Sequence, residues 1–312
     1  SGGNGRPVGT RTSAGEGCVG FGRAARDLWP LVPATLYLSG FLIVVLCYLV
    51  GLAFTAPIGD GATFPTLHTV STVISSERFR VALTNTILFC LIGTPLELLT
   101  GAALAFLLFR RFALRSMVRS LFLLPLAVPA LVTAIVLLIL FDYPGGHVNH
   151  LLTGKYSVVP ALLSHPINWR GSGFFVLGVS LMGKVWRDMP ISMLIILSGL
   201  NAIDTTLLEA ATTMGAGWRA QFRYIVIPLL IPAVSAVLLL RSIEMWKEFI
   251  FPFVLAGRHE LLGTLIESLY NQWGAPHEAA VVALVMVTGI VATVFVLRGA
   301  TGLLRRLGAG VR

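Results

Sequence analysis

Long apolar stretches alternate with short polar connections along most of this 312-residue chain. A helix needs roughly 20 apolar residues to cross ~30 Å of hydrocarbon, and six stretches reach that length. They cover about residues 31–56, 81–109, 119–141, 173–199, 224–251 and 278–300. Because lipid cannot satisfy backbone hydrogen bonds, we expect all six to be helices. Five prolines should lie near helix ends or at kinks: Pro125, Pro129, Pro190, Pro228 and Pro232.

This pattern predicts an all-α membrane protein with six transmembrane helices. The membrane domain would cover residues 29–302, with a polar loop at 200–223 between the fourth and fifth spans. Residues 1–28 are rich in Gly, Arg and Ser, which predicts a flexible cytoplasmic tail. Residues 303–312 would form a second, short cytoplasmic tail.

Composition supports lipid as the solvent. The chain is 56% hydrophobic and 12% charged, with a mean hydropathy of +0.85, whereas a soluble protein carries about 25% charged residues. Its three cysteines are an odd number, and two of them lie in apolar stretches, so no disulfide framework is indicated. No spacing of residues typical of a metal site occurs.

The net charge of +9 reflects membrane orientation rather than nucleic-acid binding, because the basic residues cluster in short loops between apolar stretches. With the N-terminus inside, the inner segments hold 14 Lys and Arg residues. The outer loops then hold only five, namely Arg78, Arg80, Lys155, Arg170 and Arg258. This asymmetry predicts that both termini and the 200–223 loop face the cytoplasm.

Motifs of catalysis are missing from the sequence. It contains no G-x-x-x-x-G-K-[ST] phosphate loop, no G-x-S-x-G elbow and no H-E-x-x-H pair. We therefore predict no catalytic residue, no metal site and no ATPase activity in this chain.

The 200–223 loop has a distinctive pattern. Glu209-Ala210-Ala211 is followed by Gly215 after three residues and by Ile225-Val226-Ile227-Pro228 nine residues later. Asp204 or Thr205 can cap a short helix that contains the acidic residue. Gly215 permits a turn with positive φ, and a second helix would begin near Trp218.

This spacing resembles the EAA loop of permease subunits in binding-protein-dependent ABC importers, whose pattern is E-A-A, three residues, G, nine residues, I-x-L-P. One position differs, because Ile227 stands in place of Leu. The resemblance implies a type I importer-like permease fold and a loop that docks into a cytoplasmic ATP-binding subunit. The coupling residues would be Leu208, Glu209, Ala210, Ala211, Met214 and Gly215.

Four further segments resemble, more weakly, motifs of carbohydrate permeases of the maltose/trehalose type. They are Asn85–Thr86, Gly146–Leu152, Val185–Pro190 and the aromatic-rich end of the fifth span. Two places depart from the sugar pattern. Met214–Ala216 replaces the usual Asp-Gly-Ala, and Ala256-Gly257-Arg258 stands where G-G-P is common.

The family resemblance also implies the partners and the location. They are a second, homologous but different permease chain, two ATP-binding subunits that hold ATP and Mg, an extracytoplasmic solute-binding protein, and membrane lipid. No cofactor and no nucleic acid would bind this chain. It would be a multi-pass protein of the bacterial cytoplasmic membrane that works by alternating access.

Two predicted spans carry charges, which cost several kcal/mol in lipid and so usually face a cavity or a partner. The fourth holds Lys184, Trp186, Arg187 and Asp188, and the fifth holds Arg241, Glu244, Trp246, Lys247 and Glu248. Lys184 and Asp188 are spaced i, i+4 and can pair. These residues predict either a polar solute path or ion pairs that hold the helices together. Glu97 and Asn85 are predicted to be structural hydrogen-bonding groups.

Three other functions stay open from the sequence. They are an ion-driven secondary transporter, an ABC permease for a solute other than sugar, and a membrane enzyme or scaffold. Secondary transporters often contain internal repeats, and none is evident here. The charges of the two spans lack a nucleophile–base pairing, which disfavours an enzyme.

Overall fold

A computed structural model describes residues 29–55, 65–110, 112–158, 160–257 and 259–309. The predicted tail at 1–28 and the last three residues lie outside the described residues. The chain divides into two units, Ser1–Gly51 and Leu52–Arg312. The first unit contains η1 (Trp29–Leu31) and most of α2 (Val32–Ala53).

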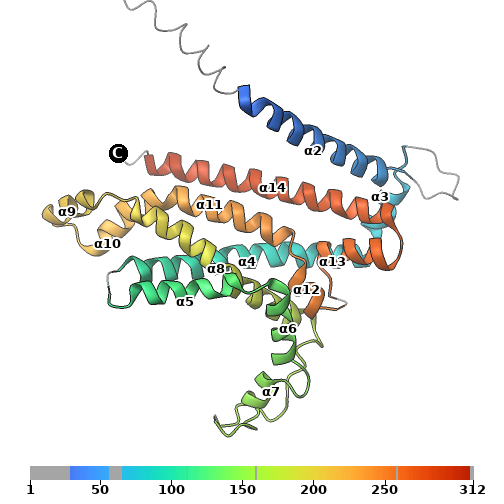
Figure 1. The fold of residues 1–312 in the computed structure, drawn as a ribbon, viewed down its shortest axis with the longest axis horizontal. Helices are drawn as coiled ribbons and strands as arrows, with labels where there is room; N and C mark the ends of the chain where they lie inside the picture. Colours follow the sequence, from blue (N-terminus) through green and yellow to red (C-terminus); the bar gives the residue numbers. More distant parts are fainter. Residues whose placement is uncertain (1–28, 56–64, 111, 159, 258, 310–312) are drawn as a thin grey trace, which may run out of the picture. The chain divides into compact units, whose positions relative to one another are not determined.

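Every regular element in the described ranges is a helix, and the all-α class is confirmed. The second unit contains α3 (His68–Ser75), α4 (Glu77–Phe109), α5 (Arg115–Ala127), α6 (Ala130–Leu140), α7 (His147–Leu152), α8 (Gly173–Asn201), α9 (Thr205–Thr213), α10 (Trp218–Gln221), η2 (Phe222–Val226), α11 (Ile227–Trp246), α12 (Ile250–Leu255), α13 (Leu262–Glu267), η3 (Ser268–Gln272) and α14 (Pro276–Ala309). Helices α4, α8 and α11 pack against one another, and α14 lies along α11 (Figure 1).

Four helical segments in the described ranges are long and apolar enough to cross a membrane: Val32–Ala53, Glu77–Phe109, Trp218–Leu255 and Pro276–Gly302. Two bent pairs raise the number to as many as six. One pair is α5 and α6, which meet at 89°, and the other is α8 and α9, which meet at 59°.

The third apolar stretch differs from the single span predicted at 119–141. It is two helices broken at Val128–Pro129. Pro129 cannot donate a backbone hydrogen bond and disfavours helical geometry in the residue before it, so the chain turns there. The fifth stretch differs too, because its helix begins earlier, at Trp218, and ends at Trp246 before a short break.

Small residues bring the central helices close together. A Cβ added at Gly101 of α4 would lie 2.5 Å from the Cβ of Ser192 in α8. A Cβ at Gly93 would lie 2.7 Å from the side chain of Met245 in α11. Close backbone approach through small residues is a common way for helices to associate in lipid, where the hydrophobic effect does not drive them together.

One asparagine organises the connection between α6 and α8. Asn149 is buried, its Nδ2 donates to the carbonyls of Asp142 and Ile167, and its Oδ1 accepts from the Ile167 amide and the Trp169 indole. The sequence motif around this residue therefore marks the centre of a hydrogen-bonded loop.

A second set of polar contacts ties the segment before α13 to the beginning of α4. Arg78 binds Glu260 through two nitrogens, each 2.6 Å from a carboxylate oxygen. Ser268 donates to the same carboxylate, and the Arg78 guanidinium lies 4.1 Å from the centre of the Trp273 ring. The Leu262 amide donates to Thr86 of the N-T pair.

Candidate functional site

The loop with the EAA-like pattern is a helix–turn–helix, α9 to α10, as the sequence predicted. Asp204 is the N-cap of α9, and its carboxylate accepts a 2.9 Å hydrogen bond from the Thr206 amide. This bond to the charged form holds the pKa of the Asp204 carboxyl below its ordinary value. The cap thus satisfies one of the free amides at the beginning of α9.

The spacing from Ala211 to Gly215 produces a Schellman turn. Gly215 has a φ of +83°, the left-handed conformation that glycine adopts without steric cost. The Ala216 amide donates to the Ala211 carbonyl and the Gly215 amide donates to Thr212, both at 2.9 Å. These two bonds satisfy carbonyls at the end of α9, which explains why the pattern places a glycine four residues after the second alanine.

Side chains of α10 hold the turn and connect it to the helical core. The Gln221 amide donates to the Thr212 hydroxyl and to the Ala216 carbonyl, each at 2.9 Å. The Trp218 ring stacks on Phe222, and Phe222 contacts Phe106 near the end of α4, both at 5.4 Å between ring centres. Packed side chains therefore connect the turn after α9 to α4.

The end of the motif marks a change of helical geometry. Residues Phe222–Val226 form a π-helical segment, and the Ile227 amide donates to the Phe222 carbonyl. Pro228 follows directly and lacks a backbone N–H, so the regular hydrogen-bond ladder cannot run through this point. Such π segments are frequent at functional sites in helices.

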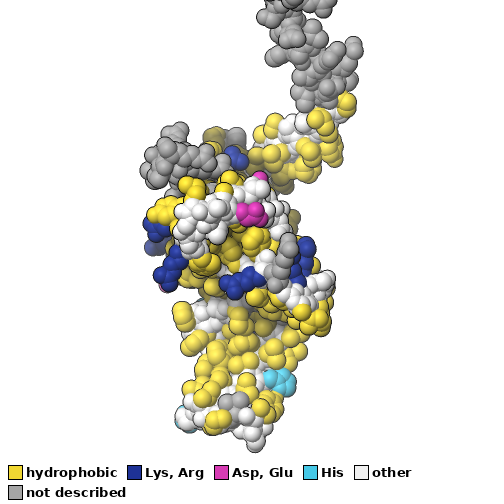
Figure 2. Space-filling model, turned by 90° about the vertical axis from the view of Figure 1, so that its left-hand side faces the viewer, with side chains coloured by type: hydrophobic (Ala, Val, Ile, Leu, Met, Phe, Trp, Pro, Cys, Tyr) yellow, Lys and Arg dark blue, Asp and Glu magenta, His cyan; other side chains and the backbone are white. Residues whose placement is uncertain are grey.

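The loop presents apolar and acidic groups to its surroundings. Met214 is 88% exposed, Trp218 66% and Leu207 50%, while Leu208 is half-buried. The carboxylate of Glu209 is exposed and forms no hydrogen bond or ion pair within the described part of the chain. Figure 2 faces this end of the molecule, where basic, acidic and apolar side chains share one surface. This composition suits a protein interface.

Charged side chains of α4, α8 and the end of α11 meet in the interior and form what we name the charge cluster. Lys184 Nζ lies 2.5 Å from Asp188 Oδ2 and 3.2 Å from Glu248 Oε2, which confirms the predicted i, i+4 pair. Arg187 also pairs with Asp188, at 2.5 Å. Arg241 Nη1 lies 2.8 Å from Glu244 Oε2.

The deepest pair of the charge cluster joins α4 to α11. Arg241 and Glu97 are both completely buried, and Arg241 Nε lies 3.7 Å from Glu97 Oε2. Neither Glu97 oxygen accepts a hydrogen bond within the described structure. Glu97 was expected to be a structural hydrogen-bonding group, yet it is the carboxylate that faces Arg241. The sequence does not show how close Glu97 lies to charged residues of other helices.

The other predicted path residues lie in different places. Trp186 is 45% exposed on α8. Trp246 is buried, packs against Gly289 and donates to Thr293 of α14. Lys247 is exposed at the end of α11 and has no ion pair among the described residues. The structure therefore brings six of the nine predicted path residues together in ion pairs and leaves Trp186, Trp246 and Lys247 outside these pairs.

Residues 97–307 match the family described as "Binding-protein-dependent transport system inner membrane component". The chain belongs to this family. It is thus the permease subunit of an ABC importer, a multi-pass inner membrane protein, and not itself an ATPase. The family carries no cofactor, and ATP binds to the partner ATPase.

Three permeases are similar to this importer permease. The trehalose/maltose transport system permease protein MalF of Thermococcus litoralis is 31% identical over 185 residues, which are 59% of this chain and 60% of the relative. The xylose/arabinose import permease protein XacH of Haloferax volcanii is 27% identical over 72% of each chain. The sulfoquinovosyl glycerol permease SmoG of Agrobacterium fabrum is 28% identical, covering 73% of this chain and 72% of the relative.

The fold is similar to that of a solved importer. A chain in the crystal structure of a bacterial ABC transporter that imports the acidic polysaccharide alginate superposes with a TM-score of 0.72 at 16% identity. The match covers 89% of this permease and 98% of the other chain. A structure of an alginate transporter with a periplasmic protein bound to alginate pentasaccharide gives a TM-score of 0.74 at 17% identity.

Proposed function

We propose that this permease imports a sugar or a related polyol. The observation that carries the sugar assignment is the set of relatives, since the named solutes of MalF, XacH and SmoG are saccharides or a glycoside of one. The Asn149 loop adds support, because it gives a structural role to one of the sugar-permease motifs. A permease for a solute of another class is the alternative.

The α9–α10 loop is the proposed contact with the ATP-binding subunit, through Leu208, Glu209, Ala210, Ala211, Met214 and Gly215. Its exposed apolar side chains and unpaired Glu209 suit a groove with a basic group. The Schellman turn and the aromatic chain from Trp218 to Phe106 make it a rigid lever. Closure of the ATPases would thereby move α4 and α11.

The complex would contain a second, homologous permease, two ATPases and an extracytoplasmic solute-binding protein. Both termini and the α9–α10 loop would face the cytoplasm. The charge cluster would lie beside the solute path, with Trp186 exposed next to it on α8. Arg187 and Glu244 are its partly exposed members, and they pair with the buried Asp188 and Arg241. Buried Lys184 pairs with Asp188 and Glu248. Buried Trp246 would support α11 against α14, and Lys247 would lie at the outer edge of the path.

Uptake by the purified complex in proteoliposomes tests this function. With its ATPases, partner permease and binding protein, it should accumulate one of trehalose, maltose, xylose or arabinose when ATP is present on the ATPase side. Uptake should survive an uncoupler, which would abolish transport by an ion-driven carrier. Accumulation of a non-saccharide alone would overturn the sugar assignment.

Cross-linking tests the coupling contact separately. A cysteine placed at Ala211 should form a disulfide-length cross-link to a cysteine on the ATPase, whereas one placed at Tyr270, which is 59% exposed in η3 between α13 and α14, should not. Absence of the Ala211 cross-link in an intact, ATP-hydrolysing complex would contradict the coupling role.

A further inference from the structure

One surface belongs neither to the α9–α10 loop nor to the charge cluster. It lies on the N-terminal parts of α4 and α8. Its apolar part is a groove of about 610 Å³, a volume in the range of roughly 300–1,000 Å³ found for small-molecule sites. The walls include Leu88 and Ile92 of α4, Phe174, Phe175 and Met182 of α8, and Trp169 of the preceding loop.

The aromatic wall of this groove is held rigidly. The Trp169 indole donates a 3.1 Å hydrogen bond to Asn149, whose side chain is itself buried in the loop core. The edge of the same ring system meets Phe141 at 5.2 Å and Phe175 at 5.8 Å between ring centres, both nearly perpendicular. A ligand therefore meets a preorganised aromatic surface, which lowers the entropy cost of binding.

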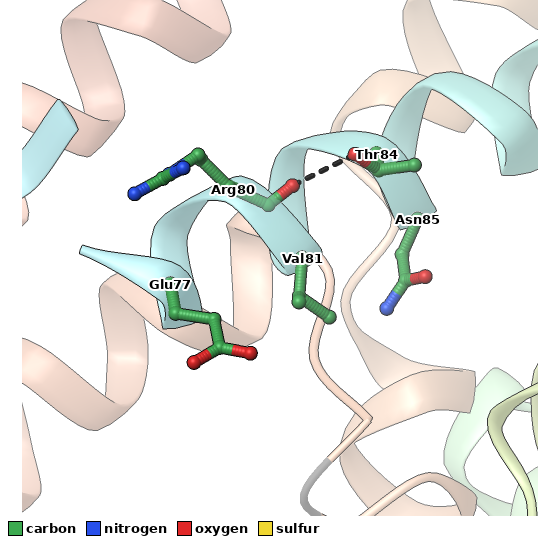
Figure 3. A pocket seen from close by; sticks show the side chains of 5 residues that line it. All are labelled: Glu77, Arg80, Val81, Thr84 and Asn85. Atoms are coloured by element: carbon green, nitrogen blue, oxygen red, sulfur yellow. Dashed lines mark hydrogen bonds between the residues drawn. The ribbon is translucent and has the colours of Figure 1, made fainter. Parts of the chain in front are cut away.

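A polar hollow of about 580 Å³ adjoins the groove along α4. It is lined by Glu77, Arg80, Val81, Thr84 and Asn85. Figure 3 shows Glu77, Val81 and Asn85 pointing to the same side of the helix. Asn85 lines both the hollow and the groove. Its Nδ2 donates to the Glu260 carbonyl, which orients the side chain.

The groove also continues toward the charge cluster. Exposed positions on α8 recur every fourth residue at Phe174, Gly178, Met182 and Trp186, and residues at this spacing share one face of a helix. The stripe ends one residue before Arg187, the partly exposed cation of the cluster. The exposed stripe of α8 thus leads from the groove toward Arg187.

Saccharides are the ligand class that fits this sequence of surfaces. Their hydroxyls match the Glu77 carboxylate and the Asn85 amide, which point to the same side of α4, and the C–H faces of their rings match aromatic walls. A lipid acyl chain could not form hydrogen bonds with Glu77, Arg80 and Asn85. We infer that this surface, which we name the α4–α8 groove, is a staging site where an entering sugar stacks before it reaches the charge cluster. This inference rests on the proposed sugar function.

Phe174 provides the test, because its side chain is 84% exposed at the mouth of the groove. In the full reconstituted complex, Phe174→Ala should raise the KM for import of the preferred sugar among trehalose, maltose, xylose and arabinose about tenfold, as expected for loss of an aromatic contact. Phe174→Tyr should restore the KM. The matched control is Phe295→Ala on α14, which is 71% exposed outside the groove and should leave the KM unchanged.

The outcomes separate the staging site from the sugar function. If the wild-type complex imports a sugar and Phe174→Ala has an unchanged KM, the staging site is wrong and the proposed function stands. A raised KM accompanied by dissociation of the permease pair in size-exclusion chromatography would overturn the inference too, because the groove would then be a subunit interface. If the wild-type complex imports no saccharide, the sugar function fails and the staging site fails with it.

Discussion

Arg241 is the buried residue whose charge lies near carboxylates of three helices. Its side chain is completely buried and lies near Glu97 of α4, Asp188 of α8 and Glu244 of its own helix. Removing one partner of a buried ion pair leaves the other charge without compensation, which is more costly than replacing both. Arg241 is therefore a point where three elements depend on one side chain.

The first prediction concerns this dependence. Arg241→Met should destabilise the protein by about 3–5 kcal/mol, because it leaves Glu97 buried and unpaired. Adding Glu97→Gln to the same chain should recover part of the loss. Denaturant unfolding of the purified permease measures both, and Lys247→Met is the control because Lys247 is exposed and has no ion pair in the described structure. An Arg241→Met variant as stable as the wild type would contradict the role of the cluster.

The second prediction concerns the Asp204 cap. Because the folded-state pKa of this carboxyl lies below its ordinary value of 3.8, the stabilisation of α9 is present above that value and is lost as the pH falls through the folded-state pKa. Asp204→Ala should speed hydrogen exchange of the Thr206 amide at neutral pH, and Asp204→Asn should largely preserve its protection. Equal exchange in all three proteins would show that the cap does not stabilise α9.

At the scale of elements, the α9–α10 loop is joined to α4 by packed aromatic side chains. The turn between α9 and α10 is fixed by the Schellman bonds and by Gln221, and the rings of Trp218, Phe222 and Phe106 connect it to α4. A change in the turn should therefore alter coupling without unfolding the spans.

The third prediction follows from the turn. Gly215→Val forces a β-branched residue into the left-handed conformation, at a cost of roughly 1–2 kcal/mol. We expect at least a tenfold loss of ATP-driven uptake, with normal insertion in the membrane. Gly217→Ala is the matched control, since Gly217 has a φ of −69° and a Cβ there meets nothing within 4 Å. Normal transport by Gly215→Val would rule out the need for this turn.

At the scale of the whole molecule, orientation decides whether the coupling loop can meet an ATPase. The basic residues favour both termini inside, and the fold places the α9–α10 loop and the junction of α4 and α5 at the same end of the second unit (Figure 1). Measuring on which side of the membrane the α9–α10 loop lies therefore also fixes the side of the α4–α5 junction.

The fourth prediction is this topology. Reporter fusions after Lys155 and Pro276 should report the outside, and fusions after Phe112 and Thr213 should report the cytoplasm, as judged by paired alkaline phosphatase and green fluorescent protein reporters. The result at Thr213 is decisive, because an external signal there would place the EAA-like loop away from ATP and remove the basis of the coupling proposal.

The sequence by itself determined the features that depend on neighbours along the chain. Helices in the apolar stretches, the Asp204 cap, the glycine turn at Gly215 and the Lys184–Asp188 pair are set by residues within about five positions of one another. Only the tertiary structure decided that Glu97 faces Arg241, that Trp246 is buried against α14, and that Trp169 and Asn85 border one groove. These relations depend on how each helix is rotated about its axis, which follows from close packing between distant segments and not from the local pattern.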